Sequence, residues 1–270
     1  MQPVLVRKLP ARAGLKWLRE GLALYRKQPF AFTSLVILYT TAMALISLVP
    51  FIGLPIALTL IPFGTIGLTL AGREAERGAI PMPTLLLAPF RDAAQRKSLS
   101  YLGLTNAGLT LLLLSLSSLL AADDMRNWKM LDGQIDKASA SENFPWDALL
   151  VSGIAYVPIL MVTWFAPQLV AWHGQRLGKA LFFSFFACWR NRWPFVTLAA
   201  ALFGITFATV FVSSQLLQAF GLSPQLIQML FAPIVLILVS VSYATQYPIY
   251  RSLIEPPAAA AAPLAVNLSR

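Results

Sequence analysis

Long apolar runs alternate with short polar connections along the whole 270-residue chain. Six of these runs hold about twenty residues each, the length that an α-helix needs to cross a hydrocarbon core of roughly 30 Å. Charged residues are absent from the central part of every run. The pattern therefore predicts an all-α membrane protein with six spans. The predicted spans are residues 30–49, 53–72, 99–121, 148–172, 195–220 and 226–250.

Turn signals group the predicted spans into three hairpins. The sequence PFIG at 50–53 joins the first two spans, and GLSP at 221–224 joins the last two. The connection 122–147, between the third and fourth spans, is longer and polar. We therefore expect residues 1–254 to form one transmembrane domain. The tail 255–270 is rich in alanine and proline and is predicted to be disordered.

The distribution of charge predicts an orientation in the membrane. Of the 21 lysine and arginine residues, 18 lie before the first span, in the connections 73–98 and 173–194, or in the tail. The connection 122–147 holds three basic and six acidic residues instead. By the positive-inside rule, we expect both termini in the cytoplasm and the acidic loop 122–147 in the periplasm.

Composition excludes several classes of protein. The chain is 57% hydrophobic and 12% charged, whereas soluble domains carry about 25% charged residues. The net charge is +10, but the basic residues flank apolar runs rather than forming a stripe, so no nucleic-acid partner is predicted. The single cysteine, Cys188, can form no internal disulfide. The basic N-terminal segment lacks the apolar core and cleavage site of a signal peptide.

A basic amphipathic segment precedes each odd-numbered span. The segments are ARAGLKWLREGLALYRKQP, TLLLAPFRDAAQRKS and LGKALFFSFFACWRNRWP. In the first, Leu15, Leu18, Leu22 and Tyr25 share one face, so we expect three interfacial helices on the cytoplasmic side. Each ends in basic side chains that could hold anionic lipid headgroups or simply set the topology. The candidate headgroup-binding residues are Arg26, Lys27, Arg96, Lys97, Arg190 and Arg192.

The second span of each hairpin, which we call the return span, shares a spacing of residues that suggests an internal repeat. Three segments begin with Pro-Ile and reach an arginine eighteen residues after the proline. The pairs are Pro55 with Arg73, Pro158 with Arg176, and Pro233 with Arg251. Eighteen helical residues rise about 27 Å, so bilayer thickness combined with the charge rule explains the spacing as well as a threefold repeat of hairpins does. Pro158 and Pro233 are predicted to kink their helices.

Few residues suggest chemistry. The chain has no phosphate-binding loop, no HExxH and no GxSxG, so no catalytic residue, metal site or cofactor is predicted. His173 lies at the inner end of the fourth span and is read as structural. An enzyme would need it beside an acidic residue such as Glu74 or Glu76. Asn106, Ser242 and Gln246 either line a path for an uncharged solute or hydrogen-bond to neighbouring helices.

Two stretches carry a resemblance to a known family. GLKWLREGLALYRKQPFAF, followed by a hairpin and GLTLAGREAERGAIPMP, resembles the start of a family of six-span bacterial inner-membrane proteins without an assigned activity. The resemblance implies an inner-membrane location and supplies no functional residues. Mitochondrial solute carriers also consist of three hairpins, but the odd-numbered spans here lack the proline and charges of that family's signature, which excludes the assignment.

The leading functional hypothesis is a non-enzymatic accessory or scaffold protein, or a binder of anionic lipid, that acts through its helix surfaces and basic segments. Its expected partners are membrane lipids, another membrane protein or a second copy of the chain. The alternative is a transporter or channel for an uncharged or hydrophobic solute, lined by the polar residues of the spans.

Overall fold

The computed structural model describes residues 5–131, 133–221 and 224–254, and almost all of them are helical. Among these residues, six helices are long and apolar enough to cross a membrane. This confirms the predicted all-α class with six spans. The predicted disordered tail 255–270 lies outside the described residues.

The spans pair into three hairpins, each made of two spanning helices that follow one another along the chain. The hairpins are α2 (Pro29–Ser47) with α3 (Gly53–Glu76), α5 (Ala93–Leu120) with α8 (Trp146–Thr163), and α11 (Arg192–Ala219) with α12 (Pro224–Ala244). The α5–α8 connection contains α6 (Ala122–Arg126), an antiparallel pair of strands β1 (Met130–Leu131) and β2 (Gln134–Ile135), and α7 (Lys137–Glu142). The other elements are α1 (Ala13–Lys27), η1 (Pro83–Leu86), α4 (Ala88–Arg91), α9 (Ala166–His173), α10 (Leu177–Arg190) and α13 (Gln246–Leu253).

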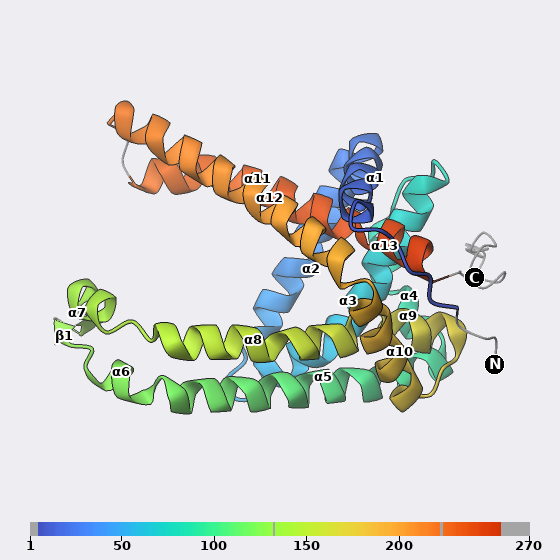
Figure 1. Cartoon of the computed structure of the whole chain (residues 1–270), viewed down its shortest axis with the longest axis horizontal. Coiled ribbons are helices and arrows are strands. Elements are labelled where there is room, and N and C mark those ends of the chain that lie inside the picture. Colours follow the sequence, from blue (N-terminus) through green and yellow to red (C-terminus); the bar gives the residue numbers. More distant parts are fainter. Residues whose placement is uncertain (1–4, 132, 222–223, 255–270) are drawn as a thin grey trace.

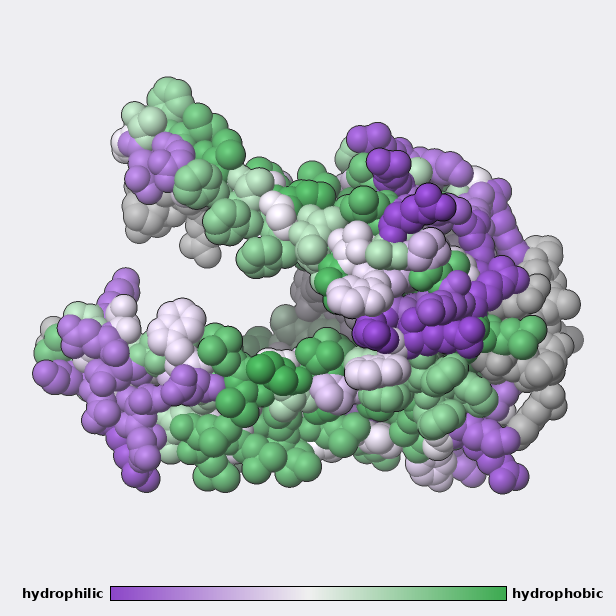
Figure 2. Space-filling model, viewed as in Figure 1, coloured by the Kyte–Doolittle hydropathy of each residue, from purple (hydrophilic) through white to green (hydrophobic). Residues whose placement is uncertain are grey.

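The three hairpins share one end of the molecule and diverge from it (Figure 1). We call this the basic end, formed by residues 5–27, 77–98, 173–192 and 246–254. Both ends of the described chain meet there, because Val6 pairs with Ile254 and the Arg7 amide donates to the Leu253 carbonyl at 3.0 Å. Hydrophilic residues gather at the basic end and at the far tip of the α5–α8 hairpin, with an apolar stretch between them (Figure 2).

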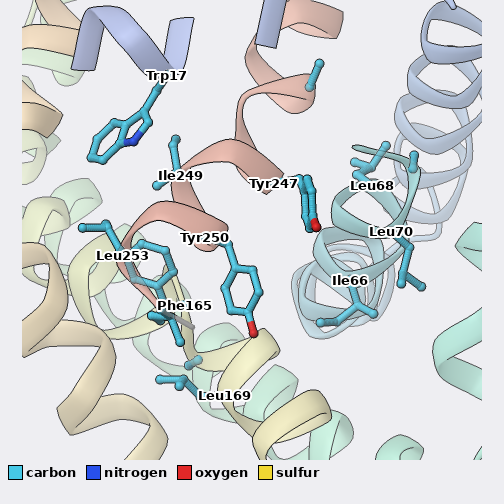
Figure 3. Packing of buried hydrophobic residues seen from close by; sticks show 14 of the residues in the cluster. Trp17, Ile66, Leu68, Leu70, Phe165, Leu169, Tyr247, Ile249, Tyr250 and Leu253 are labelled. Atoms are coloured by element: carbon cyan, nitrogen blue, oxygen red, sulfur yellow. The ribbon is translucent and has the colours of Figure 1, made fainter. Parts of the chain in front are cut away.

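The helix α3 is the centre of the packing. It contacts α2, α5, α9, α12 and α13. In its most hydrophobic 18-residue stretch, 56% of the residues are buried, against 6% in α11. Its Ile66, Leu68 and Leu70 belong to a core shared with Tyr247 and Tyr250 of α13 (Figure 3). The buried core therefore lies towards the basic end, while α8 and α11 leave most of their surface to lipid.

Two return spans are broken, at positions that were not predicted. Both α8 and α12 continue through Pro158 and Pro233, so neither helix ends there, and the kinks at these prolines stay a prediction. The helices end instead at Thr163 and Ala244, each four residues before a further proline, Pro167 or Pro248. A proline has no N–H to donate to the carbonyl four residues earlier, and its ring collides with that carbonyl. The spans therefore continue as the separate helices α9 and α13.

The remaining return span, α3, also contains a second proline, Pro62, but stays continuous. In α3, Pro62 cannot donate to the carbonyl of Leu58. The Asn106 side chain of α5 supplies the missing donor, with its Nδ2 3.0 Å from the Leu58 oxygen. Nearby, a Cβ on Gly103 would lie 2.0 Å from the Thr59 oxygen, so only glycine allows α5 to approach α3 this closely. Asn106 is thus a structural partner of a proline in the neighbouring span.

The segment preceding each hairpin packs on a return span of another hairpin. Ser184 of α10 bridges the α8–α9 break, because its Oγ accepts from the Phe165 amide at 2.9 Å and donates to the Met161 carbonyl at 2.7 Å. Gly21 of α1 lies on the α12–α13 break, where an added Cβ would be 2.9 Å from the Thr245 nitrogen. These contacts fill both breaks with protein.

The first and second amphipathic segments differ from the prediction. The buried face of α1 is centred on Trp17, Gly21 and Leu24, whereas Leu15 of the predicted apolar face is 43% exposed. The second segment is no single helix: it divides into η1, α4 and the first turn of α5. The reason is local, because Asp92 is extended and its side chain caps α5 by accepting from the Gln95 amide at 2.9 Å.

The pairing of Asn106 with the carbonyl freed by Pro62 predicts energetic coupling between the two positions. We expect Asn106→Leu to destabilise the protein by about 1–2 kcal/mol, because it leaves the Leu58 oxygen without its donor. In a Pro62→Ala background, the new amide of residue 62 can donate to that oxygen, so the same substitution should cost only a few tenths of a kcal/mol.

The measurement is a double-mutant cycle by unfolding in mixed detergent micelles. Ser115→Leu, on the exposed side of α5, is the control, because Ser115 bonds only to its own helix through the Leu111 carbonyl. An equal cost of Asn106→Leu in both backgrounds would refute the coupling.

Candidate functional site

Asn191, at the junction of α10 and α11, anchors the chain segment that precedes α1. Its side chain is fully buried. The Oδ1 atom accepts from the Leu9 amide at 2.8 Å, and Nδ2 donates to the Arg7 carbonyl at 2.9 Å. Because Arg7 also pairs with Leu253 through its amide, the segment is held between α13 and the α10–α11 junction.

Trp17 fixes α1 against α13 and α11. Its ring is 1% exposed, its Nε1 donates to the Ser252 hydroxyl at 2.7 Å, and it lies 5.3 Å from the Phe195 ring. A buried tryptophan of this kind contributes several kcal/mol to packing. The segment 7–12, α1 and α13 therefore form a fixed frame.

A cavity of about 780 Å³ lies within this frame, and we call it the basic cavity. Among the residues that the structure describes, its charged lining consists of five basic residues and one acidic residue, beside Leu9, Pro10, Leu15 and Trp17. The charged residues are Arg7, Arg12, Lys16, Arg19, Glu20 and Arg251. The concave shape and the excess of positive charge concentrate a positive potential in the cavity.

Carboxylates hold one of these cations, Arg251, in place. Arg251 donates to Glu20 of α1 at 3.2 Å and also pairs with Glu76 of α3. Lys16 lies 3.7 Å from Glu20, but its side chain is largely exposed, so this pair contributes little. The cavity is therefore chemically suited to a phosphate or carboxylate group, which arginine binds through two parallel hydrogen bonds.

The predicted headgroup residues lie elsewhere on the basic end. Arg26 and Lys27 end α1, Arg96 and Lys97 lie in the first turn of α5, and Arg190 and Arg192 flank Asn191. All six are exposed, and none of them lines the basic cavity.

Two of the predicted residues stack on aromatic rings. Arg192 lies 5.5 Å from the ring of Trp189 and 5.7 Å from that of Trp193, and Arg190 lies 6.0 Å from that of Phe186. Arginine beside exposed tryptophan is typical of a membrane interface.

Sequence reasoning missed the cavity residues. The sequence shows many basic residues before the first span, but it does not show that this segment folds against Arg251. The only signal was the recurring Pro-to-Arg spacing, in which Arg251 ends the third occurrence.

The predicted polar path is divided between two places. Asn106 lies at the α3–α5 contact, whereas Ser242 and Gln246 flank the α12–α13 break. Ser242 donates to the Leu238 carbonyl of its own helix at 2.8 Å. His173, considered for an enzyme, has its Nε2 2.9 Å from the Tyr250 hydroxyl, so its hydrogen-bond partner is a phenol rather than Glu74 or Glu76.

Metal chemistry and thiol chemistry have little support in the described part of the chain. The residues described there contain no group of three or more histidine, cysteine, aspartate or glutamate side chains that could hold a metal ion. The thiol of Cys188 is buried in α10, and burial raises its pKa to about 12. At neutral pH the side chain is therefore a neutral, unreactive apolar group.

The anchoring of the N-terminal segment predicts the effect of Asn191→Ala. Loss of both side-chain bonds should release residues 6–12 and open one wall of the basic cavity. We expect amide hydrogen exchange in this segment to accelerate by roughly 10-fold, which corresponds to about 1.4 kcal/mol of local stability. Asn127→Ala, in the exposed α6 region, is the control. Unchanged exchange in residues 6–12 would contradict the anchoring role.

Comparison with known proteins identifies a relative. No family model matches the chain, and no solved structure matches it. Over 257 residues the chain is 33% identical to a protein of Burkholderia thailandensis named a probable inner membrane protein, and the alignment covers 90% of this chain and 92% of the relative. The chain therefore belongs to the same family of bacterial inner-membrane proteins as this relative, as the resemblance in its sequence implied.

Proposed function

We propose that this protein is a non-enzymatic inner-membrane protein that binds an anionic phospholipid headgroup in its basic cavity. The observation that carries the proposal is the lining of that cavity, where the described residues include five basic side chains and one carboxylate within a frame built by Trp17 and Asn191. Each basic residue near an anionic membrane surface contributes about 1 kcal/mol of attraction.

The cavity has the mixed lining that a lipid headgroup requires. Leu9, Pro10 and Leu15 line it beside the cations, so it offers apolar surface to the glycerol region as well as charge to the phosphate. The exposed residues Trp189 and Trp193 lie on the same end of the molecule. A soluble anion would need only the charges.

We propose that the basic end faces the cytoplasm. Both ends of the described chain and the basic connections lie there, and the loop 122–147 lies at the far tip of its hairpin (Figure 1). The positive-inside rule then places the loop in the periplasm.

An accessory or scaffold role is compatible with this function. The helices α8 and α11 leave apolar surface open to a partner. In the most hydrophobic 18-residue stretches of their spans, only 11% and 6% of the residues are buried.

The proposal predicts selective loss of lipid from a cavity variant. The triple variant Arg12→Gln, Lys16→Gln, Arg19→Gln should weaken retention of an anionic phospholipid by roughly 10–100-fold, since three attractive charges are lost. Native mass spectrometry of protein released from lipid nanodiscs, with anionic and zwitterionic phospholipid in equal amounts, measures the retention.

The control variant removes the same charge from the surface outside the cavity: Arg26→Gln, Lys27→Gln, Lys97→Gln. It should lose several-fold less lipid than the cavity variant. Equal losses would mean that net charge alone attracts lipid, and no loss in either variant would refute lipid binding at the basic end. Glycerol phosphate added at the same concentration tests whether a free phosphate replaces the lipid, and we expect it to displace little.

A transporter of an uncharged or hydrophobic solute is the second candidate. Its specific support is the pair of breaks at α8–α9 and α12–α13, because interrupted spans often line substrate sites. Polar side chains are buried near these breaks, where Gln168 donates to Thr69 at 3.2 Å.

Cysteine labelling separates the two candidates. The native chain should label very slowly with a small aqueous thiol reagent at pH 8, because a pKa of about 12 for Cys188 leaves only about 0.01% of the thiol ionised. Against this background, Asn106→Cys, Ser242→Cys and Gln246→Cys are tested one at a time.

We expect these three cysteines to label no faster than the native chain, whereas the exposed control Lys97→Cys labels fully. Rapid labelling at all three positions would favour the transporter and a water-filled path.

A further inference from the structure

We propose that the groove between α2, α3 and the η1–α4 segment binds an acyl chain of an anionic phospholipid whose phosphate is held by Arg91 and Arg96. This site shares no residue with the basic cavity. The proposed function does not involve this groove, and the inference gives it a ligand.

The groove is a small apolar space that extends from the middle of two spans to the η1–α4 segment of the basic end. Its volume is about 350 Å³, and its walls come from α2, α3, η1 and α4. Residues that define it include Ala42, Met43, Leu60, Phe63, Leu87 and Phe90. Since α2 and α3 are membrane spans, the medium at this depth is hydrocarbon, and an acyl chain matches the lining.

Two glycines of α3 allow the walls of the groove to stand close together. A Cβ on Gly64 would lie 2.1 Å from the Tyr39 ring of α2, and one on Gly67 would lie 2.8 Å from the Leu86 Cα of η1. Phe63 and Phe90 stack with centroids 4.4 Å apart and rings inclined by 11°. The short η1–α4 segment is therefore fixed against α3, and the groove is a preformed feature.

Basic side chains lie where the groove reaches the basic end. Arg96 donates from Nη1 to the carbonyl of Phe90, a groove residue, at 3.3 Å. Arg91 follows Phe90 directly, and Lys97 follows Arg96. The neighbouring acid, Asp92, is engaged in capping α5. A phosphate beside these cations would lie at the end of a chain that fills the groove.

The lining of the groove and the charges beside it, rather than its volume, select the occupant. Charge complementarity with Arg91, Arg96 and Lys97 favours an anionic lipid over a zwitterionic one.

The test uses the full chain in nanodiscs that contain an anionic phospholipid with a photoreactive diazirine at the middle of one acyl chain. Adducts are mapped by mass spectrometry of peptides. We expect groove residues Met43, Leu60 and Leu87 to carry at least five-fold more adduct than Leu112 and Leu150, which are exposed on α5 and α8. A zwitterionic lipid with the same diazirine should label the groove at least three-fold less.

Filling the groove supplies the matched comparison. Ala42→Trp and, separately, the rim substitution Leu87→Trp should lower adducts on the remaining groove residues by about 10-fold. Leu112→Trp, on the exposed face of α5, should leave them unchanged. Arg91→Gln with Arg96→Gln should lower the preference for the anionic lipid, while Arg26→Gln with Lys27→Gln should preserve it.

Three outcomes would overturn the proposal. They are uniform labelling of all exposed apolar residues, equal labelling of the groove by the two lipids, and persistence of groove adducts in both tryptophan variants. The triple cavity variant with Arg12, Lys16 and Arg19 replaced should keep its groove adducts. Failure of the groove is thus distinguishable from failure of the basic cavity.

Discussion

Where a proline frees a carbonyl beside a neighbouring helix, that helix can supply the missing donor, which hydrocarbon cannot. The second proline of each return span lies where another helix packs closely. At Pro62, Asn106 of the adjacent α5 donates to the Leu58 carbonyl, and α3 stays continuous. Before Pro167, the helix breaks and Ser184 of α10 bonds to groups on both sides. The tight contacts between hairpins are therefore found where the backbone needs them.

This pairing of a proline with a neighbouring helix places the site as well as the fold. The break before Pro248 receives Gly21 of α1, and this contact brings the basic face of α1 beside α13. Trp17 then reaches Ser252, and Arg251 reaches Glu20. The basic cavity is thus a consequence of how α1 covers the interrupted span. The outer parts of α8 and α11 contain no such break and remain exposed to lipid.

The sequence predicted the six spans and their pairing well, because apolar length and turn residues are local signals. It did not predict the breaks, since Pro158 and Pro167 look equivalent until their surroundings are known. Near Pro158 the helix is exposed to lipid, so a break would leave backbone groups unsatisfied, whereas near Pro167 Ser184 bonds to the Phe165 amide and the Met161 carbonyl. The basic cavity escaped prediction for a similar reason: Arg12 and Arg251 are distant in sequence and meet only through tertiary packing.

The basic residues of this protein consequently serve two physical roles that composition cannot separate. Arg190 and Arg192 lie over exposed aromatic rings, an arrangement that suits any membrane interface and selects no particular lipid. Arg251 is held by carboxylates from α1 and α3 within a walled cavity, where its position is fixed before a ligand arrives. Fixed charge in a concave site lowers the entropy cost of binding and can distinguish one headgroup from another. Selectivity is therefore expected from the cations that line the cavity, and general membrane attraction from those outside it.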